Sequence, residues 1–181
     1  MVNILRFKEN KEEYKRNGIF LLLIIFTAIL QNTHGLFPQI YNASAMLIIP
    51  LVICISMFER EIISMALGLA AGMIWDFYST RMDGFYSVLL VLTGFFCSYL
   101  IRRYMRNNIV TALVYTGLCS FVCVVAYWVF FVAVSGARGA GMLLLSKYLP
   151  SVLYTLILTP VYYYFIKMIS QKYRKATADE E

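Results

Sequence analysis

The residue whose type and position could carry chemistry is Asp76, a carboxylate at the end of the apolar segment 62–78. Gly68, Gly72 and Asp76 follow one another at intervals of four residues, so on an α-helix they share one face. Glycines with this spacing let a second helix approach closely, and a carboxylate at this depth needs a partner or water. The pattern predicts close helix packing, within the chain or against a second protein, with Asp76 either taking part or capping the following turn.

The next apolar segment, 84–101, opens on Gly84 and carries further small residues, such as Ser87, on one face. A loop of only five residues joins it to the segment before it, so the two segments are expected to be antiparallel neighbours. Their small faces are expected to pack on each other. Either Arg81 in the loop or a backbone N–H group is then expected to bind the carboxylate of Asp76.

No other residues form a pattern typical of catalysis or of a metal site. The sequence has no P-loop, nucleophile elbow, HExxH motif or paired buried carboxylates, and His34 has no acid or nucleophile to work with. The four cysteines lie inside apolar segments and are expected to be small buried hydrophobes: Cys54, Cys97, Cys119 and Cys123. We therefore predict a protein that is not an enzyme and that uses no cofactor and no metal.

The composition indicates a membrane protein. Of the 181 residues, 61% are hydrophobic and 14% are charged, whereas about 25% are charged in soluble domains. A soluble domain could not bury so much apolar surface, which excludes an ordinary cytosolic enzyme, a disordered chain and a disulfide-rich secreted module. The charges behind the net +6 lie in the tails and between apolar runs. That distribution orients a membrane protein and does not form a nucleic-acid site.

Six apolar stretches, most of them close to the ~20 residues that cross a bilayer, predict an all-α fold of six transmembrane helices in one bundle. They are 18–37, 43–58, 62–78, 84–101, 109–135 and 148–168. The third is short, and the fifth is long enough to be tilted or to extend past the membrane. The chain accordingly divides into a tail, 1–17, a membrane domain, 18–169, and a second tail, 170–181.

The lysines and arginines predict the orientation of these spans. If both tails lie on the same side, 13 of these residues lie on that side and three on the other, namely Arg81, Arg138 and Lys147. Short basic loops stay on the cytoplasmic side of a membrane. We therefore expect a multi-pass plasma-membrane protein with both termini in the cytoplasm.

Several local patterns occur together in a fixed order along the chain. They are Gln31 ending the first span, Pro50 in the second, the turn Phe58-Glu59-Arg60-Glu61, then Gly68-Leu69-x-x-Gly72-x-x-x-Asp76, Gly84 opening the fourth span, Arg102 and Arg103 closing it, and Leu153-Tyr154-Thr155-x-x-x-Thr159-Pro160 in the sixth. This ordered set, over about 19–168, resembles the MreD family, the rod shape-determining membrane proteins of bacteria.

The resemblance implies a non-enzymatic scaffold of the cell-elongation machinery, which builds the lateral wall, in the bacterial plasma membrane. Such a protein associates with the bitopic protein MreC, and through it with the glycosyltransferase RodA, the elongation transpeptidase and the actin-like MreB. The resemblance also implies a six-helix fold similar to the substrate-binding subunits of energy-coupling-factor transporters. The partner-contact candidates are then Gly68, Gly72, Asp76 and Gly84.

That shared fold provides the alternative, a substrate-binding membrane subunit of a vitamin transporter. Such subunits commonly carry Ala-x-x-x-Ala in the first span, whereas here Ala28 has Ile24 and Asn32 at the matching positions. The absence of this motif from the first span disfavours the transporter subunit. An ion or proton carrier needs several ionisable groups within the membrane, and Asp76 alone supports that reading poorly.

Overall fold

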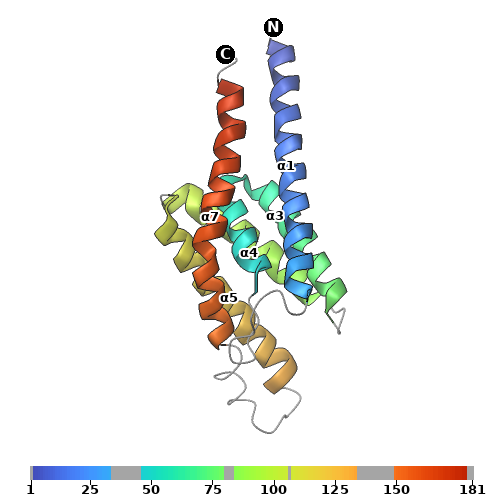
Figure 1. Ribbon diagram of the computed structural model, residues 1–181, viewed down its shortest axis with the longest axis vertical. Coiled ribbons are helices and arrows are strands. Elements are labelled where there is room, and N and C mark those ends of the chain that lie inside the picture. The colour runs from blue at the N-terminus through green and yellow to red at the C-terminus, as the bar shows by residue number, and fades with distance from the viewer. Residues whose placement is uncertain (1, 34–45, 80–83, 106, 134–148, 179–181) are drawn as a thin grey trace.

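The computed structural model of the protein describes residues 2–33, 46–79, 84–105, 107–133 and 149–178, and over this part of the chain the fold is all-helical. The helices are α1 (Val2–Asn32), α2 (Ile48–Phe58), α3 (Glu61–Tyr78), α4 (Phe85–Tyr104), α5 (Ile109–Tyr127) with the π-helical turn η1 (Trp128–Ala133), and α7 (Leu149–Ala178). They pack into one bundle, from which the first turns of α1 and the last turns of α7 project side by side at one end (Figure 1).

Four stretches of helix are long and apolar enough to cross a membrane: Glu61–Tyr78, Phe85–Tyr104, Ile109–Phe130 and Pro150–Tyr173. Their outward faces carry exposed apolar side chains, among them Val88 and Phe96 on α4. Water would not tolerate so many exposed apolar side chains, whereas lipid favours them. The prediction of a helical protein with several membrane-spanning helices is therefore confirmed at this level.

The first predicted span, 18–37, is not among these four. Its described part lies in α1, whose first half is rich in charged and polar residues, and residues 34–37 lie outside the described part of the chain. The helix begins at Val2, so helix also runs through the predicted tail 1–17. Likewise α7 continues through Pro160 to Ala178, well past the predicted end of the sixth span.

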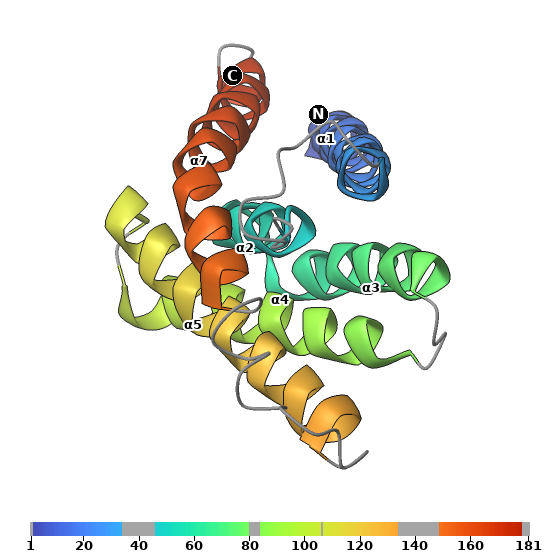
Figure 2. The ribbon, with the colours of Figure 1, turned by 60° about the horizontal axis from the view of Figure 1, so that its bottom comes forward.

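The second predicted span, 43–58, is described from residue 46 on, and its helix is shorter than the other predicted spans. It has 11 residues, or about 16 Å, against the ~30 Å hydrocarbon core of a bilayer. Every residue from Ile48 to Met57 is buried, and α2 contacts each of the other five long helices. Figure 2 shows α2 in the middle, between α1, α3, α4 and α7. A helix that is apolar on all sides is a core helix, and α2 is the core of this bundle.

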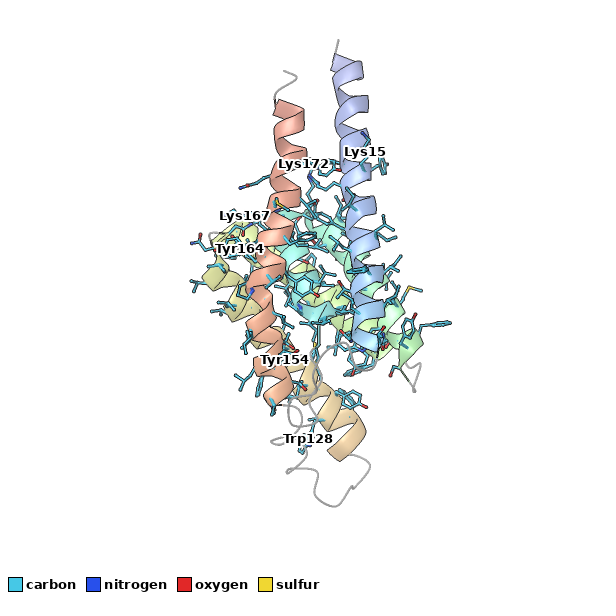
Figure 3. The ribbon with its side chains drawn as sticks, viewed as in Figure 1. Lys15, Trp128, Tyr154, Tyr164, Lys167 and Lys172 are labelled. Carbon is cyan, nitrogen blue, oxygen red and sulfur yellow. The ribbon has the colours of Figure 1, made fainter. Side chains whose placement is uncertain are left out.

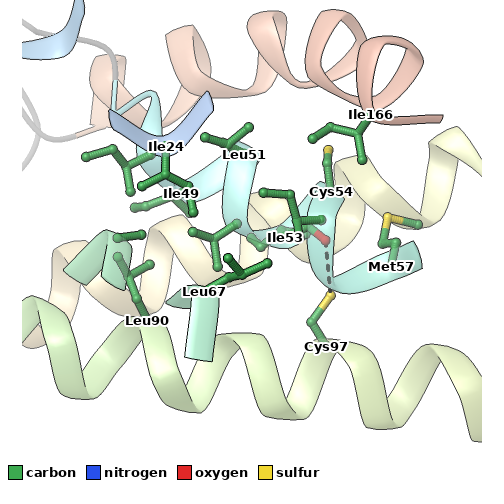
Figure 4. Close-up of a cluster of buried hydrophobic side chains, with 14 of the residues drawn as sticks. Ile24, Ile49, Leu51, Ile53, Cys54, Met57, Leu67, Leu90, Cys97 and Ile166 are labelled. Carbon is green, nitrogen blue, oxygen red and sulfur yellow. Dashed lines mark hydrogen bonds between the residues drawn. The ribbon is translucent and has the colours of Figure 1, made fainter. Parts of the chain in front are cut away.

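Buried side chains from five helices meet around α2 (Figure 4). Ile24 of α1, Leu67 of α3, Leu90 of α4 and Ile166 of α7 belong to this cluster. The thiol of Cys97 faces the backbone carbonyl of Ile53, with 3.9 Å between sulfur and oxygen. The cysteines in these helices are free thiols, and Cys54, Cys97 and Cys123 are buried.

The two ends of the bundle differ in chemistry. Lys15, Lys167 and Lys172 lie toward the end at which both termini project, whereas Trp128 lies at the opposite end (Figure 3). We call the first end the charged end; it also holds the ion pairs that join Arg16 to Glu59 and Arg102 to Glu61.

Candidate functional site

The predicted glycine face of α3 lies directly against α4, its closest partner in the bundle. A Cβ atom added to Gly72 would lie 2.3 Å from the Cα atom of Ser87 and 2.8 Å from its nitrogen. A Cβ atom added to Gly68 would lie 2.6 Å from the carbonyl oxygen of Leu90. No side chain fits at these distances, so glycine is required at both positions for the helices to touch.

The contact is reciprocal, because α4 also presents a glycine to α3. A Cβ atom added to Gly94 would lie 2.7 Å from the carbonyl oxygen of Ser64. The two backbones therefore approach closely along most of the helix pair. The small faces meet as the short loop between them predicted, and Gly68 and Gly72 make this contact within the chain.

Asp76 caps the amino terminus of α4 from the neighbouring helix. One carboxylate oxygen accepts the backbone N–H of Tyr86 at 3.0 Å. The other accepts the backbone N–H of Ser87 at 2.9 Å and its hydroxyl at 2.6 Å. The first backbone N–H groups of a helix have no partner inside it and attract a negative charge, so one buried carboxylate satisfies both needs.

Gly84 explains why the cap has to come from another helix. It is the N-cap residue of α4, with a φ of 68°, in the left-handed region that favours glycine. It has no side chain that could bond to the first turn, as a serine or aspartate at this position would. The expected backbone N–H donors, together with the Ser87 hydroxyl, bind Asp76, whereas Arg81 lies outside the described residues.

Aromatic rings flank this cap. Trp75 stacks on Tyr86 with ring centroids 4.3 Å apart and nearly parallel planes, and Tyr86 stacks on Tyr127 of α5 at 6.1 Å. In the chain, Trp75 directly precedes Asp76 and Tyr86 directly precedes Ser87, the two residues whose side chains form the cap. Sequence reasoning missed this stack, although the signal was present in the adjacent positions Trp75-Asp76 and Tyr86-Ser87.

Glu59 is a polar residue whose burial the sequence did not predict. It was expected only to belong to the turn that follows the second span. In the structure it is buried and bound by Arg16 of α1 through two atom pairs, at 2.6 and 2.7 Å. The physical reason is the shortness of α2. Its end lies inside the bundle, where a carboxylate requires a counter-charge.

Two side chains from elsewhere in the chain bind the backbone at the carboxyl end of α2, and a third supports one of them. The Ser98 hydroxyl donates to the Glu59 carbonyl at 2.8 Å, and the Asn107 amide donates to the Met57 carbonyl at 3.0 Å. The Tyr163 hydroxyl in turn donates to the Asn107 carbonyl at 3.2 Å. The bonds from Ser98 and Asn107 occupy carbonyl groups that a helix end leaves without internal partners.

The amino end of α2 is held in the same way. The Gln31 side chain accepts the backbone N–H of Ile48, and the Thr155 hydroxyl accepts that of Met46, both at 3.1 Å. Gln31 was expected only to end the first span. Here it is a cap for the buried helix.

The residues of the ordered sequence pattern thus do one kind of work in the described structure. Gln31, Asp76 and Thr155 accept backbone N–H groups at or next to the start of a helix, Glu59 pairs with Arg16, and the glycines of α3 permit close packing. Within the described residues no group of three or more His, Cys, Asp or Glu side chains could hold a metal ion. What this arrangement can do is fix helices at set positions and angles.

Comparisons with protein-family models, with curated proteins and with solved structures found no match.

Proposed function

We propose that this chain is a non-enzymatic assembly protein of the bacterial cell-elongation machinery, which binds an MreC-like bitopic protein within the bilayer. Through that protein it would be connected to RodA, the elongation transpeptidase and MreB. The proposal rests on the ordered sequence pattern that resembles MreD. The structural observation that carries it is the cap of Asp76 on α4.

That cap supports positioning as the mechanism. Asp76 is only 8% exposed, and its carboxylate already accepts three hydrogen bonds from α4, so it is engaged in holding two helices together. Glu59, the other buried carboxylate of the described chain, is held by Arg16. Both groups act on the protein's own helices, as expected of a scaffold that works by occupancy.

The alternative, a vitamin-binding transporter subunit, needs room for a ligand. In the described residues the middle of the bundle is filled by α2, whose side chains pack against the other helices. This filling favours the assembly role. The proposed site of action is the plasma membrane, crossed six times, with the charged end and both termini in the cytoplasm.

Depletion of the protein from a rod-shaped bacterium tests the proposal. Loss of a positioning protein should round the cells, independently of any added vitamin, and a tagged chain should recover a bitopic membrane protein. Cells that stay rod-shaped after depletion but lose uptake of one vitamin would show that the chain is a transporter subunit. A small molecule retained on the purified protein would agree with that outcome.

The partner's position follows in part from the α3–α4 contact. Because Gly68 and Gly72 already lie against the backbone of α4, a partner helix cannot use them without separating the two helices. It must bind an outward face instead. Crosslinking from an outward position such as Met73 is therefore expected to recover the partner more readily than crosslinking from Gly72.

A further inference from the structure

A groove runs between α4 and α5 on the outside of the bundle. These helices are consecutive in the chain but pack on each other only weakly, unlike α3 and α4. The groove has a volume of about 380 Å³ and is lined by Leu89, Phe96 and Leu100 of α4 and by Leu118 and Val122 of α5. This volume lies within the ~300–1,000 Å³ typical of sites for small molecules.

The lining offers an occupant almost only apolar atoms. The hydroxyl of Thr93, which also lines the groove, donates to the Leu89 carbonyl of its own helix. Both helices belong to the stretches long and apolar enough to cross a membrane, and the lining residues lie along their middle turns. The groove therefore opens into hydrocarbon and fits a hydrocarbon group.

A narrow chain suits the groove better than a helix does. Helices that pack inside a bilayer meet through small residues, which let their backbones approach. The small residues of α4 are used elsewhere, since Gly94 lies against Ser64 and Ser98 bonds to Glu59. Most of the side chains that line the groove are bulky, although Cys97, Cys119 and Cys123 also line it, and an acyl chain can lie between them.

The charged end of the groove carries a cation. Arg103 follows Phe96 by seven residues, close to two full helical turns, so it lies on the groove's face of α4. It is exposed, and it lies about 4.5 Å along the helix axis beyond Leu100. Its neighbour Arg102 is turned away and pairs with Glu61 of α3 at 3.6 Å.

A helix amino terminus lies beside this arginine in the chain. Asn108 is the N-cap residue of α5, and its side chain does not cap the helix. Helix amino termini bind anions, and Asp76 supplies one at the start of α4. A phosphate at the start of α5, bound also by Arg103, would place a negative charge at that amino terminus in the same way.

We infer that the groove between α4 and α5 binds an anionic phospholipid, with one acyl chain between the helices and the phosphate at Arg103 and the amino terminus of α5. The inference does not depend on the proposed role in cell elongation. It makes the lipid part of the protein's surface, at the place where α4 and α5 pack on each other only weakly.

Native mass spectrometry of the full chain, released from detergent micelles, tests this site. The probes are dioleoyl phosphatidylglycerol and dioleoyl phosphatidylcholine, which have the same acyl chains and differ in head-group charge. One phosphatidylglycerol should be retained at a lipid concentration about tenfold lower than phosphatidylcholine requires, because both head groups contain the phosphate, but the choline cation of phosphatidylcholine cancels its charge and is repelled by Arg103.

Paired variants locate the bound lipid. Val122→Trp fills the groove and should abolish retention, whereas Val114→Trp, on the exposed side of the same helix but outside the groove, should not. Arg103→Gln should remove the preference for phosphatidylglycerol, whereas Arg60→Gln, an exposed arginine at the same end, should keep it.

Three results would overturn the inference. One is equal retention of the two lipids by the unaltered chain, since the head group would then not be recognised. Another is unchanged retention by Val122→Trp. The third is that Val122→Trp releases a bound polypeptide, either a partner or a second copy of the chain, and leaves lipid binding unchanged.

Discussion

The carboxylate of Asp76 binds both the backbone N–H and the hydroxyl of Ser87, so one residue at the end of α3 fixes the start of α4. Directly beside this pair, the backbone of Ser87 lies too close to Gly72 for any side chain. A hydrogen-bonded cap and a glycine contact therefore depend on each other. If the cap is lost the helix start is free to move, and if the glycine is lost the carboxylate no longer reaches.

Replacing Asp76 with asparagine tests the cap. The amide keeps the size of the side chain but puts an NH2 group where an oxygen accepts a bond, so one N–H of α4 faces a donor. The free energy of unfolding should fall by about 1.5–3 kcal/mol, the range for a hydrogen bond to a charged group. Unfolding by SDS can be followed through Trp75, which stacks beside the cap, in a chain that carries Trp128→Phe.

Ser87→Ala provides the graded control for this variant. It removes the hydroxyl donor and leaves both backbone donors in place, so its cost should be smaller, about 0.5–1.5 kcal/mol. A larger loss for Ser87→Ala than for Asp76→Asn would contradict the assignment of the carboxylate as the principal cap.

Glycine substitutions test the packing of α3 on α4. Gly72→Ala places a methyl group into the backbone of Ser87, and overpacking of this kind costs about 1–3 kcal/mol. Gly18→Ala is the matched control, because nothing lies within 4 Å of the added methyl group in α1. Since alanine favours a helix more than glycine does, this control should be neutral or stabilising by up to about 1 kcal/mol.

Unfolding of the two purified variants measures this difference. Equal stability of Gly72→Ala and the unaltered chain would show that the helices are farther apart than described. Met73→Leu, on the outward side of the same helix, should change little because the two side chains have similar volumes.

The α3–α4 pair was the part of the fold most accessible to sequence reasoning. Its signals are local: glycines four residues apart, a carboxylate one turn later and a short connection. The roles of α2 and Glu59 were not accessible in the same way. A run such as Ile48–Met57 fits both a span and a core helix, and the partner of Glu59 lies 43 residues earlier in the chain. Only the packing of the whole bundle brings that pair together.

Labelling with an impermeant thiol reagent tests the orientation. In a chain whose four native cysteines are replaced, cysteine at Ser79 should react in intact cells, because Ser79 follows α3 at the end away from the termini. Cysteine at Asn108, at the charged end, should react only after lysis. Asn108 is the better choice over its neighbour Asn107, which is bonded to Met57 and Tyr163.

The reverse labelling pattern would place the termini outside the cell, against the distribution of basic residues. Labelling of both positions in intact cells would mean that α4 does not cross the membrane. Either result would also remove the cytoplasmic position proposed for the charged end.

The ion pair between Arg16 and Glu59 should stabilise the position of α1 on the buried helix. Removing one partner leaves the other charge buried without compensation, which costs about 3–5 kcal/mol. Arg16→Gln and Glu59→Gln should therefore each destabilise the protein strongly. The double variant pairs two neutral amides and should cost less than the sum of the two single changes, with a coupling of about 0.5–3 kcal/mol.

SDS unfolding of the four chains measures this coupling, with Arg60→Gln, an exposed neighbour, as the control. Strictly additive losses would mean that the two side chains do not interact, and that α1 is held by its apolar contacts, such as that of Ile24 in the core, alone.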